Sequence, residues 1–328
     1  MLSVSRFFDS FLNLLRGKEE GGPFSRFKSW EYCHERFLHY HNSRRELEES
    51  EIDLLALNLS FYLASWGMYR GSSFILQRDY KTHKEIVRRV FKSDYNSLWD
   101  YDPINSSDEE MKEIAECAYE AYKDIVDAYG DIPERYFAEG SGADADKPVS
   151  ITLITKILMG TFAISPAFDR FFIDGIKCHN ANHEAEMGCQ SHYFDHEEFI
   201  DDLVQLFKFA NRQRENLVIP AEVTRANYPI MKRVDMYFWE VGYEYGFYCS
   251  LRESEEKVDS DSGMIEGTKS KKAFVKILKQ IETIFPEFDF SGNTDKDKII
   301  SLKEQLNARL DLSESMKTKK KKKKEETE

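Results

Sequence analysis

One lysine and one aspartate stand out because each is a charged residue in largely apolar surroundings. Lys156 interrupts the apolar run 149–163, and Asp169 follows shortly after Pro166. An unpaired ammonium is costly to bury, so Lys156 must reach water, a carboxylate or a ligand. We expect a helix to restart at Pro166, which puts Asp169 in the first turn of that helix. The helix dipole favours the ionised form of a carboxylate at this position. The pattern predicts a general base held ionised at pH 7, or a structural ion pair of Asp169 with Lys156 or Arg170.

The segment 63–73, LASWGMYRGSS, combines glycines with an aromatic face and hydrogen-bond donors suited to phosphate. Gly67 and Gly71 lie close together, although each glycine costs a helix roughly 1 kcal/mol relative to alanine. They allow another backbone or a ligand to approach closely. The candidate nucleic-acid-binding residues share stacking rings or phosphate-type donors: Trp66, Tyr69, Arg70, Ser72, Ser73 and Arg78. A tight helix crossing with an ordinary turn explains the same pattern.

Basic side chains gather around that segment. Residues 62–92 hold seven Lys or Arg against two acidic residues, with aromatic side chains between them. Proteins bind phosphates and stack bases with such surfaces, so we expect a positive groove along 63–83. The alternative is a solvated helix face that pairs with the acidic segment 101–149.

Six potential metal ligands lie within nineteen residues of one another. They are Cys178, His179, His183, Cys189, His192 and His196. Two His pairs have one-turn spacing, and neutral His and Cys are common Zn²⁺ ligands. The segment has neither Cys-x2-Cys nor His-Glu-x-x-His, so zinc is a weak candidate cofactor. A polar loop whose histidines titrate near neutrality is the alternative.

The hexapeptide Arg78-Asp-Tyr-Lys-Thr-His83 resembles the Arg-polar-x3-His motif of HEPN-type ribonucleases, which are all-helical toxins of bacterial defence systems. The resemblance implies that His83 acts on a ribose 2′-hydroxyl and that Arg78 stabilises phosphate. The interval recurs at Arg36 and His41, so chance produces it readily.

The stretch TKILMGTFAISPAFDRFF, residues 155–172, resembles the active-site region of helix-hairpin-helix DNA glycosylases, especially divergent bacterial members. The resemblance implies a helical fold with a cleft between two lobes, where a base is flipped and its N-glycosidic bond is cleaved. Asp169 would be the catalytic carboxylate, and Lys156 an amine nucleophile or a substrate-orienting cation. The later YPIMKRVDMYFWEVG, with Asp235 and Trp239, would be a packing helix. No Gly-apolar-Gly hairpin precedes Lys156, which departs from the family.

Helical periodicity dominates the elements that must position these residues, so we predict an all-α, multi-helix fold. The expected helices share apolar residues at three- and four-residue steps and cover 51–69, 107–129, 149–163, 166–176, 197–214, 228–248 and 273–310. Polar stretches without such periodicity predict loops at 136–148, 178–196 and 251–272. We therefore expect a helical main domain (1–250), a flexible linker (251–272), a C-terminal helical segment (273–310) and a disordered Lys-rich tail (311–328).

Composition excludes several classes of protein. The 328 residues carry 46 Lys+Arg against 59 Asp+Glu, a net charge of −13, and 41% are hydrophobic. This composition predicts a folded soluble chain. Five scattered cysteines argue against a disulfide framework and for a reducing cytoplasm, and no apolar run is long enough to span a bilayer. P-loop, dinucleotide-binding and Gly-x-Ser-x-Gly motifs are absent from the sequence.

The sequence favours a nucleic-acid-processing protein, most specifically a DNA glycosylase-like enzyme that excises a flipped base. The chain is also similar to bacterial proteins associated with phage defence, which implies modified phage DNA as a substrate. The enzymatic alternative is a HEPN-type ribonuclease. The non-enzymatic alternative is a helical scaffold that binds a partner protein.

Overall fold

The structure is a computed structural model that describes residues 28–71, 73, 75–76, 78–130, 149–182, 198–219 and 228–312, together with Val4, Phe7 and Lys317. Regular structure in these residues is helical, apart from one isolated bridge between Val258 and Ile265. The all-α prediction is therefore confirmed. Across the same residues, no helix is both long and apolar enough to cross a membrane.

The chain forms two compact units. The N-terminal unit comprises Val4–Asp169 and Met187–Tyr237. The C-terminal unit comprises Met1–Ser3, Arg170–Glu186 and Phe238–Glu328. This division differs from the expected one, because the chain passes between the two units four times, once inside helix α9.

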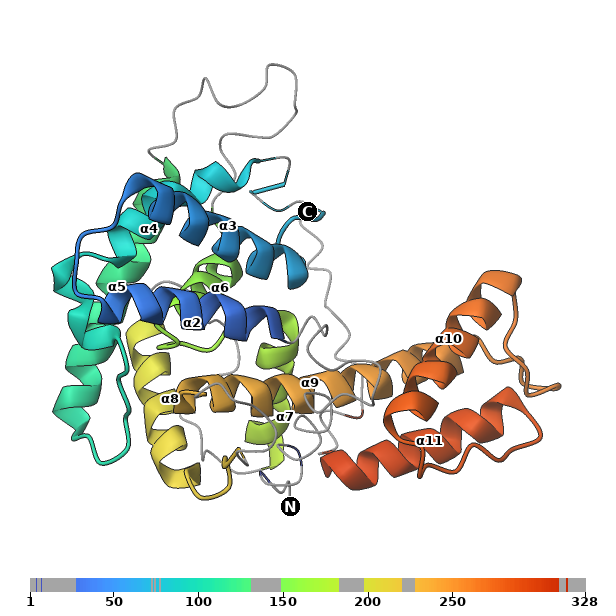
Figure 1. Ribbon diagram of the computed structural model, residues 1–328. Helices are drawn as coiled ribbons and strands as arrows, with labels where there is room; N and C mark the ends of the chain where they lie inside the picture. The colour runs from blue at the N-terminus through green and yellow to red at the C-terminus, as the bar shows by residue number, and fades with distance from the viewer. Residues whose placement is uncertain are drawn as a thin grey trace, which may run out of the picture. The chain divides into compact units, whose positions relative to one another are not determined.

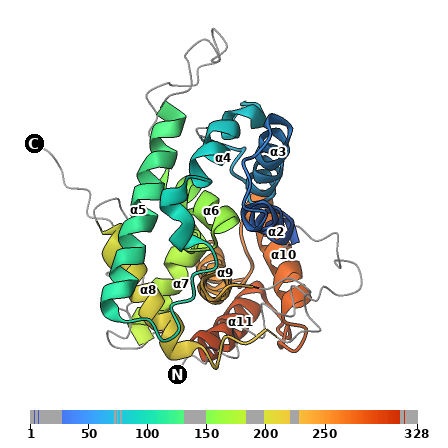
Figure 2. The same cartoon turned by 60° about the vertical axis from the view of Figure 1, so that its left-hand side comes forward.

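Figures 1 and 2 show the helices of the N-terminal unit. They are α2 (Ser29–Asn42), α3 (Glu49–Ser65), η3 (Tyr80–His83), α4 (Lys84–Val90), η4 (Ser93–Leu98), α5 (Asp108–Gly130), α6 (Ile151–Thr161), α8 (Phe199–Gln213) and the first part of α9 (Ile230–Glu255). Helix α5 packs on α4, α6 and α8, while α3 packs on α2, α4 and α6.

Helix α6 is the most deeply buried element of this unit. All residues from Leu153 to Thr161 are buried, Lys156 included. Its N-cap is Ser150, whose hydroxyl accepts a hydrogen bond from the Leu153 amide at 3.3 Å. Two α2 side chains bond to carbonyls of its last turn: Trp30 Nε1 donates to Met159 O at 2.8 Å, and His34 Nδ1 lies 2.8 Å from Thr161 O. Two of the carbonyls that lack helical partners are thereby satisfied.

The C-terminal unit contains α7 (Arg170–Asn182), the rest of α9, α10 (Thr268–Ile284) and α11 (Asp295–Leu310). Helices α7 and α9 cross at very short range. A Cβ atom at Gly175 would lie 1.9 Å from the carbonyl oxygen of Phe238, and one at Gly242 would lie 1.8 Å from that of Phe171. Only glycine fits at these two positions.

Residues 251–272 are more regular than the linker expected there. Helix α9 continues to Glu255 and α10 begins at Thr268. Ile265 lies between these two helices, and its amide donates a hydrogen bond to the Asp295 carboxylate at 2.9 Å. The same carboxylate accepts a hydrogen bond from Lys271 of α10 at 2.5 Å. These tertiary bonds replace the apolar periodicity that the segment lacks. The tail 311–328 lies mostly outside the described residues.

A buried acidic pair links α9 to α11. Glu240 and Glu244 are both fully buried, and Arg309 donates to both carboxylate oxygens of Glu244, at 2.6 and 2.9 Å. Within the described residues, the Glu240 carboxyl has no hydrogen-bond partner. Burial, and then the neighbouring Glu244 carboxylate, raise the pKa of Glu240 well above 4.5, whereas Arg309 lowers it. Burial therefore favours the protonated, neutral form of the Glu240 carboxyl.

The α7–α9 crossing predicts opposite outcomes for two glycines of one helix. Gly242→Ala forces the backbones apart and should lower the free energy of unfolding by about 1–3 kcal/mol. Gly246→Ala is the matched control, because its Cβ would meet only the Phe171 ring at an ordinary 3.5 Å. That control should be neutral or stabilising by up to about 1 kcal/mol. Urea unfolding measures both, and equal effects would contradict the crossing.

The burial of Glu240 predicts a pH-dependent stability. Its native pKa lies above its unfolded value, so the native state binds the extra proton and stability falls as pH rises above about 4.5. Glu240→Gln keeps the shape and removes the ionisation. Its stability relative to the wild type should therefore increase with pH, by at most about 1.4 kcal/mol per pH unit. Denaturant unfolding from pH 4 to pH 8 measures the difference, and a pH-independent difference would refute the assignment.

Candidate active site

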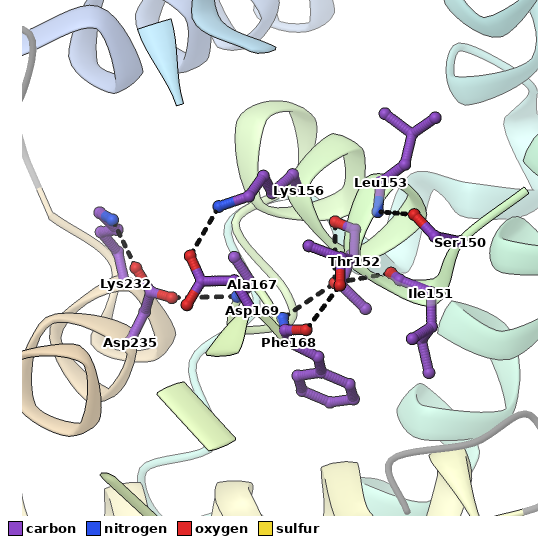
Figure 3. Close-up of polar contacts among 11 residues, drawn as sticks. Ser150, Ile151, Thr152, Leu153, Lys156, Ala167, Phe168, Asp169, Lys232 and Asp235 are labelled. Carbon is purple, nitrogen blue, oxygen red and sulfur yellow. Dashed lines mark hydrogen bonds and ion pairs between the residues drawn. The ribbon is translucent and has the colours of Figure 1, made fainter. Parts of the chain in front are cut away.

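Lys156 and Asp169 form an ion pair in the N-terminal unit. Lys156 Nζ donates to Asp169 Oδ2 at 2.9 Å, and Figure 3 shows the side chains pointing towards each other. The lysine side chain is 3% exposed and the aspartate side chain 19% exposed. The expected pairing is therefore present. Asp169 directly precedes α7, which begins at Arg170. The prediction that Asp169 lies inside the first turn of a helix is therefore wrong.

Side chains hold the backbone before Asp169 in a non-helical conformation. The Phe168 amide donates to Thr155 Oγ1 at 2.9 Å, and Thr152 Oγ1 donates to the Phe168 carbonyl at 2.9 Å. The Ala167 amide donates to Asp235 Oδ1 at 3.0 Å. These bonds, drawn in Figure 3, explain why the helix starts later than Pro166 predicts. They also fix the point from which the Asp169 side chain projects.

A second ion pair comes from the first turns of α9. Lys232 Nζ donates to Asp235 Oδ2 at 2.6 Å, and both side chains are 8% exposed. From the sequence, Asp235 is expected only in a packing helix, and Lys232 is not among the candidate site residues. Lys232 and Asp235 carry the same sequence signal as Lys156, because they too are charged residues among apolar ones.

Two tryptophan rings lie beside the ammonium groups. Lys156 Nζ is 5.5 Å from the Trp66 ring centroid, and Lys232 Nζ is 5.9 Å from it. Lys232 Nζ is also 5.4 Å from the Trp30 ring. Such cation–π contacts offset part of the cost of removing the ammonium groups from water. Trp66 is thus the member of the segment 63–73 that the fold brings to Lys156.

Tyr62 of α3 completes the surroundings. Burial raises the pKa of Tyr62 well above 10, and the carboxylates of Asp235 and Asp169 act in the same direction. A Cβ atom at Gly160 of α6 would lie 2.7 Å from the Tyr62 ring, so this glycine lets α3 and α6 approach. The phenol is therefore a neutral group close to both carboxylates.

The histidine of the ribonuclease-like motif is fully buried. His83 Nε2 lies 2.7 Å from the Tyr69 hydroxyl, and Nδ1 lies 2.9 Å from the Tyr129 hydroxyl. Burial lowers the pKa of His83 to about 3. A neutral imidazole has one donor and one acceptor nitrogen, so the two tyrosines satisfy it completely. This arrangement disfavours His83 as a group that reaches a ribose.

The other expected nucleic-acid ligands lie on the turn between α3 and η3. Arg70 is exposed, and its guanidinium lies over Gly67. Ser73 and Arg78 are half-buried, and burial lowers the pKa of Arg78. Ser72 lies outside the described residues.

The three cations of α4 and Lys92, which follows the helix, have carboxylate partners. Lys84 and Arg88 pair with Glu49 of α3, and Arg89 and Lys92 pair with Asp124 of α5. Asp124 belongs to the acidic segment 101–149. Intramolecular ion pairs therefore engage four of the seven cations of residues 62–92, and all four lie after the groove expected along 63–83.

The expected metal cluster is only partly covered by the structure. Cys178 and His179 lie in α7 and are fully buried, and burial raises the pKa of the Cys178 thiol. His183, Cys189, His192 and His196 lie outside the described residues. Among the residues that are described, no group of three potential ligands could hold a metal ion.

Comparisons with protein-family models, with curated proteins and with solved structures find no match to this chain.

The unequal exposure of the first ion pair predicts unequal mutational costs. Asp169→Ala leaves the buried Lys156 ammonium without this carboxylate and should cost about 3 kcal/mol of unfolding free energy. Lys156→Met should cost less, because water can reach the remaining carboxylate. Combining both substitutions should recover part of the loss. Chemical unfolding of the three variants measures this, and additive costs would contradict a direct pair.

Proposed function

We propose that this protein processes nucleic acid by hydrolysing the N-glycosidic bond of a flipped base, with Asp169 as the catalytic carboxylate. One observation carries the proposal. Of the four charges in the two ion pairs, the Asp169 carboxylate is the most exposed, at 19% against 3% to 8% for the others. A substrate that approaches the site therefore meets a carboxylate already held in position.

The chemistry follows from the charge that develops during base departure. The sugar acquires cationic character as the glycosidic bond lengthens, and a fixed carboxylate stabilises that charge. Asp169 also accepts the proton of the attacking water, whose oxygen forms the new bond to the sugar carbon. The departing base takes the electron pair of the broken bond and is protonated by solvent. Such electrostatic stabilisation is worth several kcal/mol where water is scarce.

Lys156 acts in this proposal as a positioning residue. Its Nζ donates to Asp169 and is almost inaccessible, so the pair supports orientation of the carboxylate rather than attack on the substrate by the amine. Trp66 is half-buried, and an indole ring suits stacking against an extruded base. The resemblance to phage-defence proteins makes modified bases in DNA the first substrates to test.

The test is base release from normal and modified DNA and RNA, detected as abasic sites by alkali cleavage of the DNA and as free base by chromatography for the RNA. Asp169→Asn removes the charge and should lower the release rate at least about 100-fold. The double variant Lys156→Met/Asp169→Asn removes the buried ammonium together with the charge of Asp169. It should therefore be stably folded and inactive. Asp201→Asn is the matched control, because Asp201 is an exposed carboxylate of α8 in the same unit. It should retain full activity.

Full activity of Asp169→Asn would overturn the assignment. Absence of base release by the wild type on every substrate would reject the proposed function and favour a scaffold. Strand cleavage without abasic sites would favour a ribonuclease instead.

A further inference from the structure

Four lysines form a stripe along α10 of the C-terminal unit. Lys269, Lys272, Lys276 and Lys279 follow one another at steps of three or four residues, so they lie on one face of the helix. All four are exposed, whereas Phe274 and Ile281 are buried on the opposite side. We call these four residues the lysine stripe.

The lysine stripe is positively charged, although the chain as a whole is negatively charged. Helix α10 contains five lysines and a single acidic residue, Glu282, in a chain of net charge −13. The fifth lysine, Lys271, points elsewhere and binds Asp295. In the part of the chain that the structure describes, no ion pair joins a stripe lysine to a carboxylate. This distinguishes the stripe from the cations of α4, which have such partners.

The spacing suits a polyanion better than a small anion. A helix rises 1.5 Å per residue, so neighbouring stripe lysines are about 5 Å apart along the axis and the stripe extends about 15 Å. One small anion could meet only one or two of these ammonium groups. A chain of regularly spaced phosphates could meet all four.

We propose that the lysine stripe binds the phosphate backbone of nucleic acid without reading its sequence. The choice of nucleic acid rests on the proposed function. No aromatic side chain lies among the four lysines, so the stripe can contact phosphates but cannot stack bases. An open hollow of about 550 Å³ beside Lys272, bordered by Thr268 and Val275, leaves room for a phosphate group.

An anionic membrane is the less favoured partner for this helix. Membrane-surface helices insert an apolar face between the lipids. The apolar face of α10 is already covered, because Phe274 and Ile281 are buried. Because that face is covered, the lysine stripe could attract lipid headgroups only by charge.

The experiment measures binding of a short unmodified DNA duplex by fluorescence anisotropy, in the Asp169→Asn background so that no turnover interferes. Lys269→Gln/Lys272→Gln/Lys276→Gln/Lys279→Gln should bind at least 10-fold more weakly at low salt. Each phosphate contact contributes about 0.9 to the slope of log affinity against log salt. Between about 50 and 200 mM salt, the loss of four contacts should therefore make the slope shallower by about 3.6. The matched four-arginine variant keeps the charge and should keep the slope.

An unchanged affinity and slope in the four-glutamine variant would overturn the inference. Failure of the wild type to bind the duplex would overturn it as well. Tighter binding to vesicles of anionic phospholipid than to DNA would reassign the stripe to a membrane surface. Stripe-dependent DNA binding without any base release would uphold this inference while rejecting the proposed function, so the two failures are distinguishable. Unchanged melting temperatures of the variants establish that the substitutions leave the fold intact.

Discussion

The buried ammonium of Lys156 is the constraint on which the candidate site depends. Removing an ammonium from water is costly unless a carboxylate and further favourable contacts surround it. Asp169 supplies the carboxylate and Trp66 supplies an aromatic face. The backbone before Asp169 must therefore stay in one conformation. Thr155 and Asp235 hold it there through hydrogen bonds to consecutive amides.

This constraint joins elements that are far apart in the chain. Asp235 both pairs with Lys232 and holds the segment that carries Asp169, so the two ion pairs are mechanically connected. Helix α3 contributes Tyr62 and then Trp66 just after its last turn. A site assembled in this way tolerates few changes, because loss of Asp169, Lys232 or Asp235 leaves its buried partner charge without a counter-charge.

Two basic surfaces of the chain differ in how their charge is used. The α4 cations lie next to carboxylates of α3 and α5, and these ion pairs satisfy much of their charge within the fold. The lysine stripe of α10 carries four ammonium groups on a face that forms no such pairs with the described residues. Its counter-charge must therefore come from outside the described residues. Basic side chains of α4 therefore form ion pairs within the fold, whereas those of the lysine stripe are available for binding.

The sequence by itself determined the all-helical class and most helix positions, because apolar periodicity is a local property of the chain. It also singled out Lys156 and Asp169, because a charge in an apolar run needs a partner. Tertiary structure decided that Asp169 precedes α7, since the Thr155 and Asp235 bonds to its neighbours cannot be inferred from local spacing. It likewise decided that His83 is buried between two tyrosines. The charge of residues 62–92 was visible in the sequence, but the pairing of four of its cations with Glu49 and Asp124 was not. Ion pairs depend on which helices become neighbours, and that is set by the packing of the whole unit.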